Sequence, residues 1–242
     1  MLFDKSVKYS YAAQKTKGRK LRIIIFCFLG FLAVYLCLNA LVFSMNALQS
    51  DAMQPGLRKG ERFICSSYTI QSLFFRDGDT DHFPFARGDV VIIDPRRAKR
   101  RGFFAAAFDE LLRFLTAQQF GLAGREERRY FKRVIGLPGD EVSMTNFVVR
   151  VKPAGGLYRL TEFEVAEKDY TPSIPQLPAL WDETLPFSGN METITLKKNE
   201  CFVLSDDRAN TNDSRTWGPL PLALVAGRVV FRYWPPTRMG RP

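Results

Sequence analysis

The chain has 242 residues, with 35 Lys and Arg against 25 Asp and Glu, which gives a formal net charge of +10. That length suits one domain of ordinary size with room for a membrane segment. Two local clusters account for the whole excess of positive charge. Residues 1–22 hold seven basic side chains and one acidic one, and residues 96–101 hold five basic ones. A general nucleic-acid-binding surface is therefore not expected.

The chain contains a single histidine, His82, and four cysteines. One histidine excludes a metal site built from several histidines, and it leaves one candidate for a histidine-based catalytic triad. His82 lies in an acidic, turn-rich stretch, so we expect it on a solvated loop. The cysteines show no C-x-x-C spacing, so no structural zinc site is expected.

An uncharged stretch of 21 residues runs from Ile23 to Phe43. A helix of this length spans roughly 31 Å, which matches the hydrocarbon core of a bilayer. A buried core helix rarely runs so far without a polar face. A cleavable signal peptide has a shorter apolar region followed by a small-x-small site, which is not evident here. We therefore predict one uncleaved transmembrane anchor over residues 23–43.

The basic segment before the anchor predicts its orientation. The positive-inside rule places residues 1–22 in the cytoplasm and residues 44–242 on the outer face of the membrane. No second apolar stretch of that length follows in the sequence, so a single pass is expected. Cys65 and Cys201 then lie on the oxidising side, where they either form a disulfide or remain two separate buried residues.

Short β-rich runs alternate with turn residues throughout the exported part. Strands are predicted at residues 62–70, 89–95, 130–137, 141–151, 200–206 and 227–235. This pattern predicts a mainly β domain with complex connections rather than alternating βαβ units. The proline-rich stretch 171–190 is predicted to be an extended loop.

One stretch of the exported part has helical periodicity. Its apolar side chains recur at three- and four-residue spacing, which predicts an amphipathic helix over residues 103–120, within an insertion at 96–129. The basic cluster at 96–101 directly precedes this helix. Such a segment either lies on the lipid surface near the anchor or packs on the β domain with its basic lead-in in water.

A nucleophilic enzyme with so little histidine needs another base, and a desolvated lysine can serve. Lys132 lies between aromatic and β-branched residues on a predicted strand that ends at a Pro-Gly turn. Lowering the pKa of a lysine from about 10.4 to about 7–8 costs roughly 4 kcal/mol, which an apolar cleft can supply. Taken alone, a solvent-facing lysine near a sheet edge remains the alternative interpretation.

Four segments, taken together and in order, favour the catalytic interpretation of Lys132. They are SDAMQPGL at 50–57, RGDVVIIDP at 87–95, FKRVIGLPGD at 131–140 and SDDRANTNDSRTWG at 205–218. This set resembles the boxes of the type I signal peptidases (bacterial leader peptidases), membrane-anchored Ser/Lys proteases that remove signal peptides from exported preproteins. The last two boxes are highly specific, and the basic segment, the anchor and the exported domain agree with the family's layout.

The resemblance implies a role for each matching position. Lys132 falls on the general base, and Ser50 falls on the serine whose hydroxyl helps to form the oxyanion hole. Thr211 takes the place of the serine that hydrogen-bonds the lysine, while Asp213 and Arg215 fall on the pair that supports the site. The resemblance also implies a signal-peptidase-like β domain in the bacterial plasma (inner) membrane. Its partners would be membrane lipid and the signal peptides of secretory preproteins, and no metal or organic cofactor would be needed.

The largest departure from the family's boxes is Ala52, which occupies the place of the nucleophilic serine. A methyl group has no lone pair to attack a carbonyl, so the chain as written is not expected to form an acyl-enzyme. Either the serine has been replaced to trap a protease, or the gene encodes a non-catalytic protein that binds signal peptides. Ser50 is a further candidate nucleophile, because residues i and i+2 of a strand face the same side. Smaller departures are Gly56 for Thr, Ser205 for Gly and Asp207 for Asn.

Overall fold

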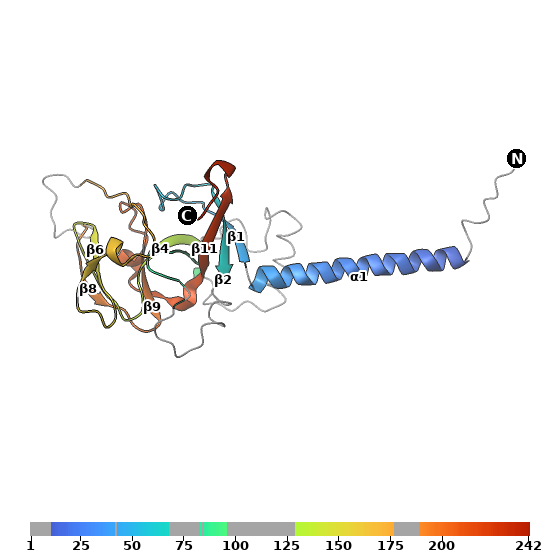
Figure 1. Ribbon diagram of the computed structural model, residues 1–242, viewed down its shortest axis with the longest axis horizontal. Coiled ribbons are helices and arrows are strands. Elements are labelled where there is room, and N and C mark those ends of the chain that lie inside the picture. Colours follow the sequence, from blue (N-terminus) through green and yellow to red (C-terminus); the bar gives the residue numbers. More distant parts are fainter. Residues whose placement is uncertain (1–10, 42, 68–82, 84, 96–128, 177–188) are drawn as a thin grey trace.

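The computed structural model describes residues 11–41, 43–67, 83, 85–95, 129–176 and 189–242. A long helix, α1 (Tyr11–Leu41), leads into a domain built from two antiparallel sheets, as Figure 1 shows. The mainly β fold predicted from the strand pattern is confirmed.

Helix α1 extends away from the β domain (Figure 1). It begins well before the predicted anchor, in the basic segment, and ends at Leu41, so that Phe43 belongs to the first strand. Many large apolar side chains of α1 are exposed, namely Leu21, Ile23, Ile24, Ile25, Phe26, Phe28, Leu29, Phe31 and Val34. Among the residues whose placement is described, no helix combines the length and the hydropathy that a membrane crossing requires.

The larger sheet has seven strands, and every neighbouring pair in it is antiparallel. In spatial order they are β1 (Phe43–Ala47), β2 (Arg62–Ser67), β11 (Val225–Trp234), β3 (Val90–Ile93), β4 (Tyr130–Gly136), β9 (Glu200–Leu204) and β10 (Leu220–Pro221). Four of these strands lie within predicted runs, and β11 begins two residues before the run predicted at 227–235. The strand pattern did not predict β1, which begins at the last residue of the apolar stretch, or β10, which has two residues and contains a proline.

The smaller sheet has four strands in the order β7 (Leu160–Thr161), β6 (Val148–Lys152), β5 (Glu141–Thr145) and β8 (Met191–Thr195). The prediction of a single strand over 141–151 is wrong, because this run forms the β5–β6 hairpin. Its two-residue turn is Asn146-Phe147, with φ of 50° and 62°. Such a turn usually carries Gly or Asn at both positions. Because Phe147 is large and apolar, residues 141–151 have the pattern of one continuous strand, and the turn was not predicted.

Apolar side chains cover both faces of the larger sheet, as the alternation along β3 shows. Val90 and Ile92 join a cluster on one face, and Val91 and Ile93 join a cluster on the other. A third cluster joins the two sheets through Ile135, Phe202 and Leu204 of the larger sheet and Val142, Val149 and Val151 of the smaller one.

Cys65 and Cys201 are both free and buried. Cys65 belongs to the cluster on one face of the larger sheet and Cys201 to the cluster on the other. The structure therefore contradicts a disulfide between them and agrees with two separate buried residues. Burial raises the pKa of both thiols to about 12, so they stay protonated and unreactive at neutral pH.

The remaining described elements are short: the helices α4 (Glu162–Val165) and α5 (Ser214–Trp217) and the 3-10 turns η3 (Leu222–Leu224) and η4 (Pro236–Arg238). His82, the predicted helix at 103–120 and residues 96–128 of the predicted insertion lie outside the described residues. The same holds for residues 177–188 of the predicted loop, whose described part contains an isolated bridge between Ser173 and Asp207.

The Pro-Gly turn that follows β4 is held by one buried carboxylate. Asp140 accepts hydrogen bonds from Arg87 Nε at 2.9 Å and Nη2 at 2.8 Å, and from the N–H groups of Leu137 and Ala154 at 2.8 and 3.0 Å. Gly139 has a φ of +87°, a conformation that side chains other than hydrogen disfavour. These residues of the second and third boxes thus fix the end of β4, which carries Lys132.

Candidate active site

Lys132 lies on β4 with only 2% of its surface exposed. The interpretation of Lys132 as a solvent-facing lysine is therefore wrong, because β4 is an inner strand of the sheet. Burial is the main cause that lowers the pKa of Lys132, to about 8, and the nearby carboxylate of Asp213 opposes the shift only in part. About a tenth of the lysine is then neutral at pH 7, which lets it act as a base.

The amine of Lys132 contacts one hydroxyl and one aromatic ring. Its Nζ donates a hydrogen bond to Ser205 Oγ at 2.8 Å and lies 5.8 Å from the ring centroid of Trp217. Thr211, the partner that the resemblance implies, engages its neighbours through its backbone carbonyl, which accepts from Thr216 Oγ1 at 2.5 Å and from the Asp213 N–H at 2.8 Å. Among the described residues, the hydroxyl within hydrogen-bond distance of Nζ is thus that of Ser205.

Asp213 and Arg215 form a buried pair directly behind Ser205. Arg215 donates to the Asp213 carboxylate from Nε at 2.9 Å and from Nη2 at 2.8 Å, and the Ser205 N–H donates to the same carboxylate at 2.9 Å. Burial raises the pKa of Asp213, but the hydrogen bonds and the charge of Arg215 outweigh it, and the net pKa lies below its usual range. Arg215 also donates to the carbonyls of Arg208 and Asn210 at 2.8 and 2.6 Å, which fixes the loop before α5.

Ala52 and Ser50 lie on the loop between β1 and β2. Ala52 is buried, and its carbonyl accepts from the Asp207 N–H at 3.0 Å, which joins this loop to the one that follows β9. Ser50 is exposed, and its Oγ accepts from the Ala52 N–H at 3.2 Å. Ser50 lies outside any strand, so the alternation that favoured it as a substitute nucleophile does not apply.

A cavity of about 230 Å³ brings three of the predicted residues together. It is lined by Gln49, Ser50, Ala52, Arg129, Tyr130, Phe131, Lys132, Asn210 and Asn212. Thr211, Asp213 and Arg215 do not line this cavity. Tyr130, Asn210 and Asn212 also line the cavity, although the sequence did not indicate them as wall residues. The two asparagines flank Thr211, so their place next to a matched position of that box was the available signal.

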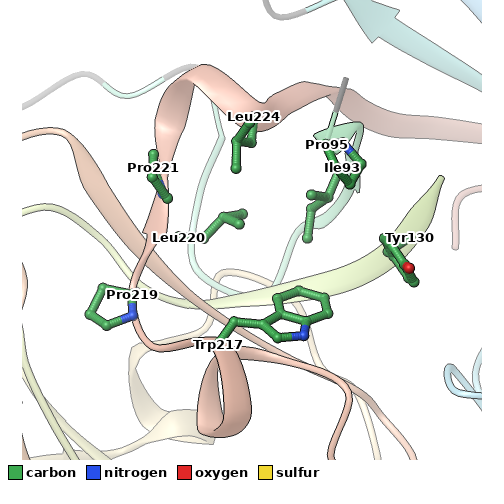
Figure 2. A pocket seen from close by; sticks show the side chains of 8 residues that line it. All are labelled: Ile93, Pro95, Tyr130, Trp217, Pro219, Leu220, Pro221 and Leu224. Carbon is green, nitrogen blue, oxygen red and sulfur yellow. The ribbon is translucent and has the colours of Figure 1, made fainter. Parts of the chain in front are cut away.

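An apolar cavity of about 330 Å³ adjoins the first one, because Tyr130 lines both. Figure 2 shows the Trp217 indole lying across this cavity between Pro219 and Tyr130. The two rings meet edge to face, with centroids 5.5 Å apart, and the Trp217 Nε1–H donates to Asn212 Oδ1 at 3.0 Å. Trp217 thus contributes to the packing on the Lys132 side of the sheet and ties it to the asparagine-containing loop.

The opposite face of β4 carries buried ion pairs. Arg133 binds the Asp206 carboxylate through Nε at 2.6 Å and Nη2 at 2.5 Å, and its guanidinium lies 4.1 Å from the ring centroid of Tyr170. Arg208 pairs with Glu162 at 2.5 Å, and the Tyr170 hydroxyl donates to the same carboxylate. These pairs hold the residues that follow β9 close to β4.

Within the described part of the chain, no three His, Cys, Asp or Glu side chains gather into a candidate metal site. The chemistry that the described geometry offers is that of a buried amine of lowered pKa beside a cavity. Such an amine can accept a proton from a nucleophile that attacks an acyl group.

Comparison with known proteins identifies the family. The protein-family model for signal peptidases, peptidase S26, matches residues 20–234. The chain belongs to the signal peptidase S26 family. The probable signal peptidase I-1 of Synechocystis is 26% identical over 211 residues, which cover 87% of this chain and 81% of the relative. Signal peptidase I of Bacillus caldolyticus is 33% identical over 203 residues, which cover 82% of this chain and 83% of the relative.

A crystal structure of a signal peptidase I from Enterococcus faecalis V583 aligns with this chain at 21% identity and a TM-score of 0.30. The alignment covers 60% of this chain and 95% of that one. Membership of the family confirms the prediction made from the four boxes: the chain is a type I signal peptidase by sequence, in a class of serine-type endopeptidases that process signal peptides.

Proposed function

We propose that the cavity beside Lys132 binds the signal peptides of secretory preproteins and is built for acyl transfer by a Ser/Lys dyad. Lys132 is the general base in this proposal, and position 52 is the place of the nucleophile. The observation that carries it is that a buried amine of lowered pKa lines one cavity with Ala52 and Ser50. With Ala52 in place, the chain holds a signal peptide without cleaving it.

The chemistry of the dyad needs a hydroxyl at position 52. The neutral amine of Lys132 takes the proton of that hydroxyl, and the oxygen attacks the scissile carbonyl. The Ser50 hydroxyl donates to the oxyanion, and the backbone N–H of residue 52, which donates to Ser50 Oγ at 3.2 Å in this structure, turns to the oxyanion when the substrate binds. The ammonium of Lys132 then protonates the leaving amine, and water hydrolyses the ester with Lys132 again as base.

The edge of the larger sheet supports binding of an extended peptide. β1 is an edge strand, and it ends at Ala47, two residues before Gln49 in the wall of the cavity. A peptide that pairs with an exposed strand edge gains main-chain hydrogen bonds and places alternate side chains toward the sheet. A signal peptide added beside β1 therefore reaches the cavity in extended form.

Ala52→Ser is expected to convert the chain into an active protease. The measurement is the appearance of mature product from a purified preprotein, followed over time by gel electrophoresis with the full chain in detergent. The chain with Ala52 is expected to bind a synthetic signal peptide, measured by fluorescence anisotropy, and to give no product. The chain with Ala52 is expected to bind without cleaving because its cavity lacks only the hydroxyl oxygen that would attack the peptide.

Ala47→Ser is the matched control, because it adds the same hydroxyl at an exposed position of β1 outside the cavity. It should leave the chain inactive. If Ala52→Ser gives no product while the peptide still binds, the chain is a non-catalytic signal-peptide-binding protein. If peptide binding is also absent, the proposed function fails altogether.

We propose further that the helical part of the predicted anchor, residues 23–41, holds the chain in the bacterial plasma membrane in a single pass. Residues 1–22 then lie in the cytoplasm and the β domain on the outer face, where it contacts lipid and where cleavage sites of exported preproteins emerge. The uncharged sequence of this stretch and the exposed apolar side chains of α1 support the proposal.

Leu29→Arg combined with Leu32→Arg is expected to release the chain from membranes. Each arginine at the centre of a spanning helix costs about 2.5–3.5 kcal/mol of insertion free energy. The measurement is the share of the chain that stays in the membrane pellet after alkaline carbonate extraction. Leu29→Ala with Leu32→Ala is the control and should stay in the pellet. A native chain recovered in the carbonate supernatant would contradict the anchor.

A further inference from the structure

Ser205 stands directly opposite Lys132 because of the register of two strands. β4 and β9 pair antiparallel with Arg133 opposite Leu204 and Val134 opposite Val203. One step further along the same register places position 205 across from Lys132. Side chains at such opposite positions lie within reach of each other. A hydroxyl at position 205 therefore reaches the lysine amine without any adjustment of the loop that follows.

The contact between the two side chains is buried on all sides. Ser205 is 0% exposed and Lys132 is 2% exposed, so water does not compete for the 2.8 Å hydrogen bond between Nζ and Oγ. A buried ammonium needs an acceptor, and an amine that donates to a fixed acceptor has its remaining hydrogens and lone pair fixed in direction. The bond to Ser205 thus restricts the rotation of the amine on the side away from the cavity.

Ser205 is itself held by the buried pair behind it. Its N–H donates to Asp213 Oδ2 at 2.9 Å, and Arg215 binds that carboxylate through Nε and Nη2. Among the described residues, Asp213 and Arg215 make no hydrogen bond to the lysine amine. Their hydrogen-bonded connection to Lys132 runs through the backbone and the hydroxyl of Ser205.

We propose that Ser205 is the positioning residue of Lys132, in the role that the sequence assigned to Thr211, and that Asp213 and Arg215 orient the lysine through it. Ser205 occupies the position at which the fourth signal peptidase box has glycine, so this chain has a hydroxyl that the box lacks. The part of the proposal that concerns turnover rests on the proposed function. The part that concerns the amine does not, because it applies to the chain with Ala52.

The first test uses the chain with Ala52, in detergent, and needs no activity. The 13Cε resonance of Lys132, assigned with Lys132→Met, is titrated by NMR. Ser205→Ala should lower its pKa by about one unit, a tenfold change in the proton dissociation constant, because the ammonium loses its acceptor. The charged groups around the amine, Asp213, Asp206 and Arg215, are unchanged in this variant.

Two control variants keep this test falsifiable. Ser214→Ala removes another buried serine hydroxyl of the same segment, one that accepts from the Val203 N–H at 3.1 Å, and should leave the titration of Lys132 unchanged. Thr211→Val should also leave it unchanged. A shift in Thr211→Val, or none in a folded Ser205→Ala, overturns the proposal.

The second test uses the Ala52→Ser form and measures preprotein cleavage. Adding Ser205→Ala should lower kcat by about 10- to 100-fold with KM within twofold, because the substrate does not touch Ser205 and only the direction of the base changes. An equal rise in KM with kcat unchanged overturns the positioning role. If Ala52→Ser itself is inactive, the catalytic part of the proposed function fails, and the NMR titration still decides the role of Ser205.

Discussion

In the Ala52→Ser form, replacing Lys132 with Met is expected to lower kcat for preprotein cleavage by about 10⁴-fold or more. Lys132 is the one buried amine in the wall of the described cavity, so its loss leaves no described base beside position 52. Steady-state kinetics on a purified preprotein measure the effect. Met keeps the length and the apolar part of the lysine side chain, so the loss reports the amine and not the packing.

The pH dependence of the same form is the first control on this prediction. The base must be neutral, and burial lowers the pKa of Lys132 to about 8. Activity should therefore rise as the pH increases and level off above about pH 8. Any residual activity of Lys132→Met should lack this rise. A Lys132→Met variant that stays within tenfold of its parent would contradict the Ser/Lys mechanism.

The pH dependence of stability provides the second control, and the sign of that dependence follows from the direction of the pKa shift. The folded chain binds the Lys132 proton more weakly than the unfolded chain, whose lysine has its ordinary pKa of 10.5. Burial of the charge therefore lowers stability below about pH 8. This penalty, up to about 3 kcal/mol, disappears as the pH rises to about 10.5. Lys132→Met should lack this pH-dependent rise and be at least as stable at pH 7, as measured by urea unfolding.

The sequence predicted the residues that depend on local pattern. The strand predicted over residues 130–137 is confirmed by β4, and Tyr130 and Val134, which alternate along it, pack in one cluster. Ser50, Ala52 and Lys132, which the resemblance assigns to one site, line the same cavity. Their separation in the chain is large: Lys132 lies on a strand that the sequence pattern predicted, whereas Ser50 and Ala52 lie on a loop that only the first box indicated.

Features set by strand register were not predictable in the same way. Ser205 and Lys132 are 73 residues apart, and their contact follows from the pairing of β4 with β9, which the sequence of neither strand specifies. Thr211 matched the box by position, yet the hydroxyl that reaches the amine belongs to a residue noted only as a departure. The hairpin at Asn146-Phe147 was missed because the turn carries a large apolar side chain.

Asp206→Asn is expected to lower the free energy of unfolding by about 3–5 kcal/mol. Asp206 and Arg133 have side chains that are 1% and 7% exposed and are joined by two short hydrogen bonds. Asparagine keeps the shape of the carboxylate but leaves the buried Arg133 charge without the carboxylate that neutralises it. Urea unfolding, monitored by tryptophan fluorescence, measures the change. The slope of the unfolding free energy against urea concentration should be the same for both chains.

Lys197→Met is the matched surface control. Lys197 pairs with Glu200 at 3.5 Å, but its side chain is 79% exposed, so breaking that pair should cost less than about 1 kcal/mol. Combining Asp206→Leu with Arg133→Met should restore part of the stability that Asp206→Asn loses, because it removes both charges. It should not restore all of it, since Arg133 Nη1 also donates to the Gly88 carbonyl at 2.6 Å.

The same ion pair connects stability to the site, because Asp206 directly follows Ser205 in the chain. When the ion pair with Arg133 is lost, residue 206 is held less firmly against β4. The neighbouring Ser205 hydroxyl, opposite Lys132, is then less well fixed in position. In the Ala52→Ser form, Asp206→Asn should therefore reduce kcat at temperatures where the chain is still folded. A loss of stability with kcat unchanged would show that the ion pair only holds the two strands together. A cost below about 1 kcal/mol would contradict a buried charge left unpaired.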